Sequence, residues 1–190
     1  MSGTFGKSSD RKLIERIANA DKAAVQALFA RYHVRIYRFI VRMVGIEAVA
    51  EELANEVFLD VWRQAGRFES RSSVSTWLMA IARNKAVSHL RRKKDMPLDE
   101  QAAELIADTQ DTPEVTAQKN DKGSAIRKAI DSLSPDHKAV IDLVYYHELS
   151  VREVAKVLDI PANTVKTRMF HARKNLAEKM KRAGIDRGWP

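Results

Sequence analysis

Hydrophobic residues recur at steps of three and four along the first 95 residues, which is the spacing of one face of an amphipathic helix. The pattern predicts a short helix that ends before Asp21, a second helix that stops at Gly45, a third over residues 47–64 and a fourth that starts near Ser73. Because no strand-like alternation competes with these helices, the sequence predicts an all-α fold. The inward residues expected on the second helix are Val25, Leu28, Phe29, Tyr32, Ile36, Phe39, Ile40 and Met43.

Helical spacing resumes after about residue 121. Ile126, Ile130 and Leu133 mark one helix, and Ser134 followed by Pro135 is a typical start of the next.

Residues 150–180 have the pattern of a helix-turn-helix. Ser150 and Glu153 match a capping box, and Pro161 in the short turn suits the first position of the following helix. That helix has the inward stripe Val165, Met169, Ala172 and Leu176, and the outward residues Lys166, Thr167, Phe170, His171, Lys174 and Asn175. A basic helix of this kind can lie in the major groove of DNA. The alternative is a helical hairpin with a solvated basic face.

Charge divides the chain into blocks. The net charge of +8 favours an anionic partner, nucleic acid first and an anionic membrane surface second. Residues 70–94 contain seven Arg or Lys and no acid, residues 95–121 contain eight acids and one Lys, and residues 161–182 contain seven bases and one acid. We interpret the acidic block as a flexible linker between two small helical domains.

The composition excludes several classes of protein. With no cysteine, the chain has no disulfide framework or thiol chemistry. We expect a cytoplasmic protein, because the chain shows no secretory signal and no apolar run long enough to span a bilayer. We expect no enzyme activity, cofactor or metal site, because no nucleophile arrangement, phosphate-binding loop or ligand cluster is visible.

Three segments in this order carry a resemblance to a known family: "EELANEVFLDVWRQAGRFE", "STWLMAIARNKAVSHLRR" and "LSVREVAKVLDIPANTVKTRMFHARKNL". The chain resembles the extracytoplasmic-function (ECF) sigma factors of the sigma-70 family over nearly its whole length. The resemblance implies a disordered tail over residues 1–10, sigma region 2 over residues 11–95, the acidic linker over residues 96–121, region 4 over residues 122–183 and a tail over residues 184–190.

The resemblance implies that region 2 recognises the minus-ten promoter element and helps to open the duplex. Asn84 matches the family position at the pocket for a flipped base, and an amide can both donate to and accept from a base edge. Trp77 nearby is interpreted as a core residue. The residues expected at the minus-ten element are Ser73, Arg83, Asn84, Lys85, Arg91 and Arg92.

The resemblance also implies that the third helix binds core RNA polymerase. Acids at helical spacing form an exposed stripe, which suits a basic protein partner and repels DNA. The residues expected at this contact are Glu51, Glu52, Asn55, Glu56 and Asp60.

The second helix of the helix-turn-helix is expected to read the minus-thirty-five element. The candidate residues are Thr164, Lys166, Thr167, Arg168, Phe170, His171 and Lys174. Three positions depart from the family: Asn55 stands where a Gln is usual, Val74 where many relatives have an aromatic, and His171 where many have Arg. Promoter preference and the polymerase contact are expected to differ accordingly.

The expected function is therefore that of an alternative sigma factor, whose partners are core RNA polymerase (the beta and beta-prime subunits), promoter DNA and an anti-sigma factor. One alternative is a conventional helix-turn-helix regulator, which predicts specific operator binding without polymerase. Another is a sigma-like decoy that sequesters a regulator, which predicts protein binding without transcription.

Overall fold

The computed structural model describes residues 3–95, 126 and 128–182. The chain forms two compact units, which we describe separately as the N-terminal unit and the C-terminal unit. The elements of the described residues are helices, which confirms the predicted all-α fold. The predicted linker and the tail over residues 184–190 lie outside the described residues.

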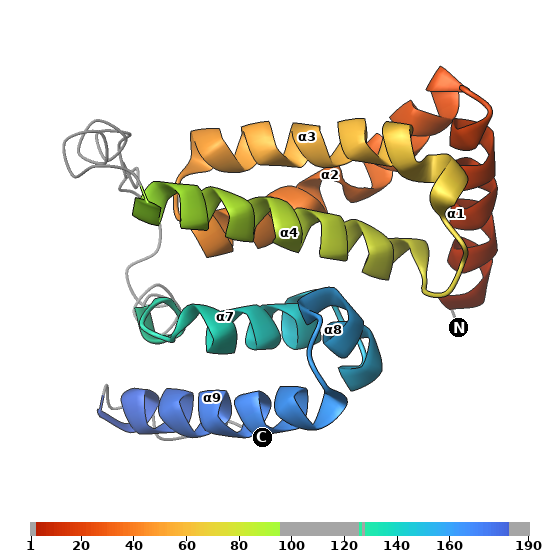
Figure 1. Ribbon diagram of the computed structural model, residues 1–190. Helices are drawn as coiled ribbons and strands as arrows, with labels where there is room; N and C mark the ends of the chain where they lie inside the picture. Colours follow the sequence, from red (N-terminus) through yellow and green to blue (C-terminus); the bar gives the residue numbers. More distant parts are fainter. Residues whose placement is uncertain (1–2, 96–125, 127, 183–190) are drawn as a thin grey trace, which may run out of the picture. The chain divides into compact units, whose positions relative to one another are not determined.

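The N-terminal unit is a helical bundle. Its elements are α1 (Gly3–Ala18), α2 (Lys22–Val44), α3 (Glu47–Gln64), the 3₁₀ turn η1 (Ala65–Arg67) and α4 (Val74–Asp95). Helices α2, α3 and α4 pack against one another, and α1 lies across one end of them (Figure 1). The fully buried side chains of this unit include Leu28, Ile36, Phe39, Ile40, Val57, Val61 and Leu78.

Both ends of α2 follow from local chemistry, as the sequence predicted. The Asp21 carboxylate accepts hydrogen bonds from the backbone N–H groups of Ala23 and Ala24, so Asp21 caps the helix. At the other end Gly45 adopts a left-handed conformation (φ 77°), which costs glycine little because it has no Cβ.

Helix α1 begins at Gly3, inside the segment that was predicted as a tail over residues 1–10. Asp10 is buried and accepts hydrogen bonds from the Tyr32 hydroxyl and the Arg31 guanidinium of α2. A buried carboxylate with two donors ties α1 to α2. The polar composition of the first ten residues does not indicate the contact with Tyr32, which lies 22 positions away in sequence.

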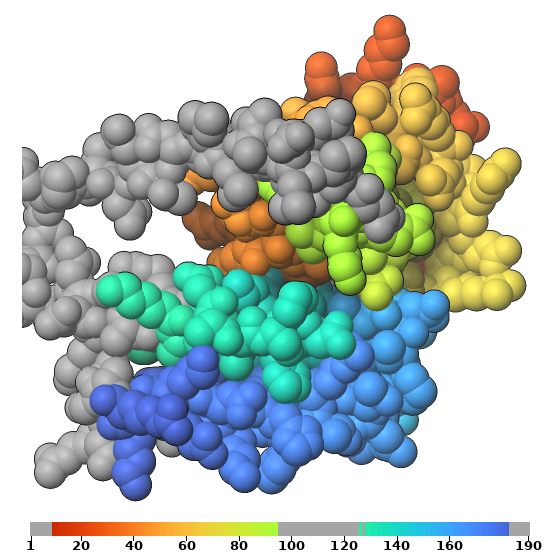
Figure 2. Space-filling model, turned by 60° about the vertical axis from the view of Figure 1, so that its left-hand side comes forward, coloured from red at the N-terminus to blue at the C-terminus, as the bar shows by residue number. Residues whose placement is uncertain are grey.

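The C-terminal unit contains a helical segment at residues 128–131, α7 (Pro135–Ile141), the π-helical turn η2 (Asp142–Tyr146), α8 (Val151–Leu158) and α9 (Ala162–Arg182). Helices α7 and α9 lie side by side along the unit (Figure 2). The core of this unit joins them to the preceding helical segment and contains Ala129, Leu133, Ile141, Ala172 and Leu176. Ser134 caps α7 and Pro135 is its first residue, as the sequence predicted.

The predicted capping box begins α8. The backbone N–H of Ser150 donates to the Glu153 carboxylate at 3.0 Å, and the N–H of Glu153 donates to Ser150 Oγ at 3.3 Å. After α8, Asp159 takes a left-handed conformation (φ 53°) in the short turn. Pro161 precedes the first helical residue Ala162 by one position, so it is the capping residue and not the first residue of α9.

Candidate nucleic-acid interface

The basic end of α4 brings most of the predicted minus-ten residues onto one helix. Asn84 is exposed, and its amide oxygen accepts a hydrogen bond from Arg83 Nη1 at 3.3 Å. Arg91 and Arg92 are exposed about two turns further along. Ser73 lies just before the helix, where its hydroxyl accepts from the N–H of Thr76 at 3.1 Å. Ser73 therefore has a structural role as the cap of α4.

Lys85 is turned away from the other α4 cations and toward α3. Its ammonium donates to Glu56 Oε2 at 2.8 Å and lies 3.0 Å from Asp60 Oδ2. The Lys85 side chain is 26% exposed. Burial lowers the pKa of Lys85, but the hydrogen bonds to Glu56 and Asp60 outweigh it and leave the pKa raised. A predicted DNA contact and two predicted polymerase contacts are thus joined in one ion cluster.

The acidic stripe of α3 divides into two halves. Glu51, Glu52 and Asn55 are exposed, whereas Glu56 and Asp60 are half-buried beside Lys85. The sequence analysis placed all five residues on one exposed stripe. It did not distinguish the two halves, because the cation that pairs with Glu56 and Asp60 comes from another helix, α4.

Two apolar residues extend the exposed face of α3 and were missed from the sequence. Leu59 is 55% exposed and Trp62 is 38% exposed. Both follow Asn55 at helical spacing, four and seven residues on, so they lie on the same side of α3. That spacing is the sequence signal that could have identified these two residues. Exposed apolar side chains beside acids form a surface suited to a protein partner.

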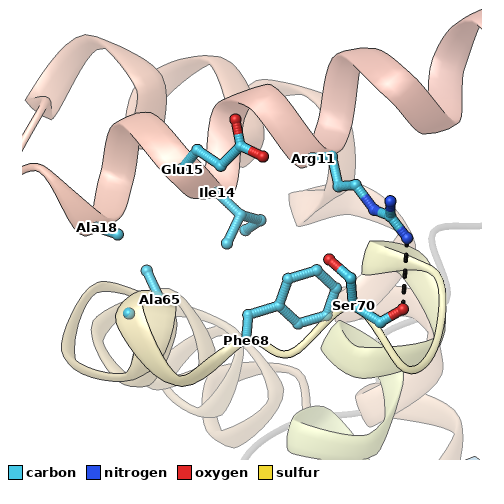
Figure 3. Close-up of a pocket in the computed structure, with 8 residues that line it drawn as sticks. Arg11, Ile14, Glu15, Ala18, Ala65, Phe68 and Ser70 are labelled. Carbon is cyan, nitrogen blue, oxygen red and sulfur yellow. Dashed lines mark hydrogen bonds between the residues drawn. The ribbon is translucent and has the colours of Figure 1, made fainter.

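The loop between η1 and α4 contributes to a pocket of about 190 Å³ beside α1. Phe68 and Ser70 line it from the loop, and Ile14 lines it from α1 (Figure 3). Asn84 is not among the lining residues. The Phe68 ring also packs against the half-buried Trp77, with the ring centroids 4.9 Å apart. Val74 is buried at the start of α4.

Helix α9 presents the predicted recognition face. The inward stripe is buried, and the side chains predicted to face outward are exposed. Phe170, predicted to face outward, is 65% exposed. Thr164 is half-buried near the start of the helix.

The first turn of α7 contacts one flank of that face. Arg168 Nη2 lies 2.7 Å from Asp136 Oδ2, and the Arg168 side chain is 28% exposed. One turn along α9, the ring of His171 stacks on His137 with the centroids 6.5 Å apart. Arg168 therefore has an intramolecular partner as well as a position beside the recognition face.

The opposite flank of α9 carries a contact that the sequence did not indicate. Arg173 Nε donates to the Tyr145 hydroxyl at 2.8 Å, and its guanidinium carbon lies 5.6 Å from the centre of the Tyr145 ring. Tyr145 is 42% exposed and Tyr146 is 53% exposed. These tyrosines come from the π-helical turn, which helical periodicity does not predict.

Comparison with known families identifies both units. The model of sigma-70 region 2 matches residues 28–95, and the model of sigma-70 region 4 matches residues 124–176. The RNA polymerase sigma-H factor of Pseudomonas aeruginosa is 30% identical, over 88% of this chain and 92% of the relative. The ECF RNA polymerase sigma factor SigW of Bacillus subtilis is also 30% identical, over 90% and 96% of the two chains.

The chain belongs to the ECF sigma factors of the sigma-70 family.

Solved structures agree with this fold. CnrH in complex with the cytosolic domain of CnrY superposes with a TM-score of 0.66 at 21% identity, covering 91% of this sigma factor and 97% of CnrH. RpoE of Bartonella quintana in complex with the anti-sigma factor NepR also gives a TM-score of 0.66, at 23% identity, covering 85% and 98% of the two chains. In the described part of this sigma factor, no helix is both long and apolar enough to cross a membrane.

Proposed function

We propose that this sigma factor binds core RNA polymerase, directs the holoenzyme to promoters with minus-ten and minus-thirty-five elements, and assists opening of the duplex. The observation that carries the proposal is that region 2 and region 4 match the two helical units in order. The chain supplies promoter recognition while the polymerase performs the chemistry, so the chain itself is not an enzyme.

The polymerase contact in this proposal is the exposed face of α3. The acids Glu51 and Glu52 attract a basic partner surface, while Leu59 and Trp62 provide apolar area to bury. Asn55 lies between the acids and the apolar residues and supplies an amide for hydrogen bonding. Charge and apolar area on one helix face support a protein partner more than they support DNA.

The minus-ten contact is the outer face of α4. Asn84 lies on this exposed face, and Arg91 and Arg92 lie further along it. Extruding a base costs a few kcal/mol, so the site must provide hydrogen bonds to the base and cations for the neighbouring phosphates. An exposed amide followed by two arginines meets both requirements, and the arginine contribution weakens as salt increases.

The minus-thirty-five contact is the outward face of α9. Thr167, His171 and Lys174 can hydrogen-bond base edges or phosphates, and Phe170 can contact a thymine methyl group. Each well-placed base contact discriminates by about 1–3 kcal/mol. The imidazole of His171 lacks the forked donors with which Arg contacts guanine, so we expect a minus-thirty-five sequence that differs from those of relatives with Arg.

We also propose control by an anti-sigma factor. The support is the pair of solved relatives, one of which is in complex with an anti-sigma factor and the other with a cytosolic domain of a partner protein. We expect such a holoenzyme to act in the bacterial cytoplasm, in association with the nucleoid.

Run-off transcription tests the proposal. Core RNA polymerase from the source organism is incubated with a pool of its genomic promoter fragments, with and without the purified chain. We expect specific transcripts only when the chain is present, and their start sites identify both promoter elements. Specific DNA binding by the chain alone without transcripts indicates an operator-binding regulator, whereas polymerase or regulator binding without transcripts indicates a decoy.

A further inference from the structure

The ion cluster of Lys85, Glu56 and Asp60 connects the two faces of the N-terminal unit that the proposed function uses. Helices α3 and α4 run alongside each other (Figure 1). Lys85 belongs to α4, whose exposed end is basic, and its two carboxylate partners belong to α3, whose exposed face is acidic. The Lys85 ammonium is thus held on the α3 side of the helix that carries the DNA contacts.

The three side chains are neither deeply buried nor fully exposed. Lys85 is 26% exposed, Glu56 is 39% exposed and Asp60 is 20% exposed. Ion pairs with this degree of exposure are weak enough to exchange partners, because water and salt compete with both charges. The lysine stem has four rotatable carbons, so the ammonium can change position without movement of the helix.

We propose that Glu56 and Asp60 are positioning residues that hold the Lys85 ammonium away from DNA phosphates in the free protein, and that a basic group of the polymerase releases it by binding these carboxylates. The released ammonium then joins the cations of α4 on the DNA backbone. This inference rests on the proposed function.

The consequence is a reciprocal coupling between the two partners. If polymerase binding increases the affinity for DNA by freeing Lys85, then bound DNA increases the affinity for polymerase by the same factor. The free protein contacts DNA with one cation fewer than the holoenzyme does. The number of cations on phosphates is measurable, because each one changes the dependence of binding on salt.

The first experiment uses the free protein and a fluorescein-labelled oligo(dT) strand of about 20 nucleotides. Binding is measured by fluorescence anisotropy over a series of salt concentrations. We expect the double variant Glu56→Gln/Asp60→Asn to bind more tightly and to steepen the slope of log K against log salt by about 0.7, the contribution of one phosphate contact on a single strand. Asp60 also lies 3.5 Å from Arg63 Nη1, so the same double substitution in the Lys85→Met background measures the effect of freeing Arg63. The steepening of about 0.7 is expected only when Lys85 is present.

The matched control is Glu51→Gln/Glu52→Gln, which removes the same charge from the same helix outside the cluster. Its effect should be the same with Lys85 or with Met at position 85. The proposal is overturned if the two double variants behave alike, or if the effect of Glu56→Gln/Asp60→Asn persists without Lys85. A change that merely loosened the helices would not depend on Lys85 in this way.

The second experiment tests release by the polymerase. With core polymerase and a forked promoter strand, we expect Lys85→Met to reduce the salt slope by about 0.7–0.9, whereas in the free protein it leaves the slope unchanged. An equal change in both states shows that Lys85 contacts DNA without release, and no change in either shows that it never contacts DNA; both results overturn the proposal. Lys85→Gln supplies a second neutral side chain.

Failure of the proposed function is recognised separately, as the absence of promoter-specific transcription by the wild-type chain. The free-protein experiment needs neither polymerase nor a promoter, so its outcome stands whatever the transcription assay gives.

Discussion

At the scale of single residues, the role of a polar side chain in this protein depends on the partner that folding brings to it. Asp10 is a polar residue in an unpatterned segment of the sequence, yet it is buried against Tyr32 and Arg31. Lys85 and Arg168 are both cations on helices predicted to bind DNA, yet each pairs with an acid of a neighbouring helix.

Tyr32→Phe should lower the free energy of unfolding by about 2 kcal/mol, because the buried Asp10 carboxylate loses a hydrogen-bond donor. Burial raises the pKa of Tyr32, and the hydrogen bond to Asp10 raises it further. Above pH 10.0, the ordinary tyrosine pKa, the unfolded chain releases a proton that the folded chain keeps, so stability should fall as pH rises.

Urea unfolding between pH 8 and pH 11 measures both effects, since Tyr32→Phe should start lower and show a flatter decline. Identical declines in the two proteins would mean that Tyr32 does not cause the loss. Some decline should remain in the variant, because burial also raises the pKa of Tyr37.

Arg168→Ala should weaken binding of a minus-thirty-five fragment by about 1–3 kcal/mol if the guanidinium contacts a base. Asp136→Ala is the matched control, because it breaks the same ion pair and leaves the guanidinium in place. For a partly exposed pair the loss of stability should be below about 1 kcal/mol in either variant. Fluorescence anisotropy at fixed salt measures the DNA affinity, and equal losses in both variants would remove Arg168 from the base contacts.

At the scale of secondary-structure elements, helix boundaries were the most predictable part of the protein. Asp21, Gly45 and the pair Ser150–Glu153 act within one or two helical turns. Ser150 and Glu153 have the partners that their spacing predicted, and Asp21 and Gly45 lie at the helix boundaries that the sequence predicted. The π-helical turn Asp142–Tyr146 and the start of α1 were not predicted. Both depend on tertiary contacts or on an irregular hydrogen-bond pattern, which periodicity does not report.

Gly45→Ala should lower the free energy of unfolding by about 1–2 kcal/mol, because a Cβ is unfavourable at φ 77°. No steric clash contributes, since an added Cβ at position 45 meets no atom within 4 Å. Gly66→Ala is the control: it also has free space, and its φ is not in the left-handed region. It should be neutral or stabilising by up to about 1 kcal/mol. Thermal unfolding followed by circular dichroism compares the two, and equal losses would argue against the conformational explanation.

At the scale of the whole molecule, function depends on two units that act on one promoter through one polymerase. Region 2 and region 4 are separate structural units, so defects in minus-ten and minus-thirty-five recognition should be separable. The free chain and the holoenzyme therefore have to be compared for each variant.

Asn84→Ala should slow formation of the open promoter complex about tenfold, while the affinity for core polymerase stays unchanged. Removing the exposed amide removes one base contact, which is worth about 1–3 kcal/mol of binding free energy. The substitution leaves the α3 face intact. Permanganate footprinting measures the open complex, and competition with a labelled wild-type chain measures polymerase binding. An equal loss in both assays would count against a role at the flipped base.

The sequence alone determined the helical fold, the family, the ends of α2, the caps of α7 and α8, and the inward and outward faces of α9. These features depend on residues within a few positions of one another, where helix geometry fixes which side chains share a face. The outer faces of α3 and α4 were also predictable as acidic and basic stripes, because periodicity reports exposure.

Only the tertiary structure decided which of these charged residues are available to a partner. Lys85 pairs with Glu56 and Asp60, and Arg168 pairs with Asp136. Asp10 accepts a hydrogen bond from Tyr32. Each pair joins different helices across 22 to 32 positions of sequence, so no local pattern reports it. A charged side chain takes the nearest opposite charge that packing provides, and packing brings together residues that the linear sequence keeps apart.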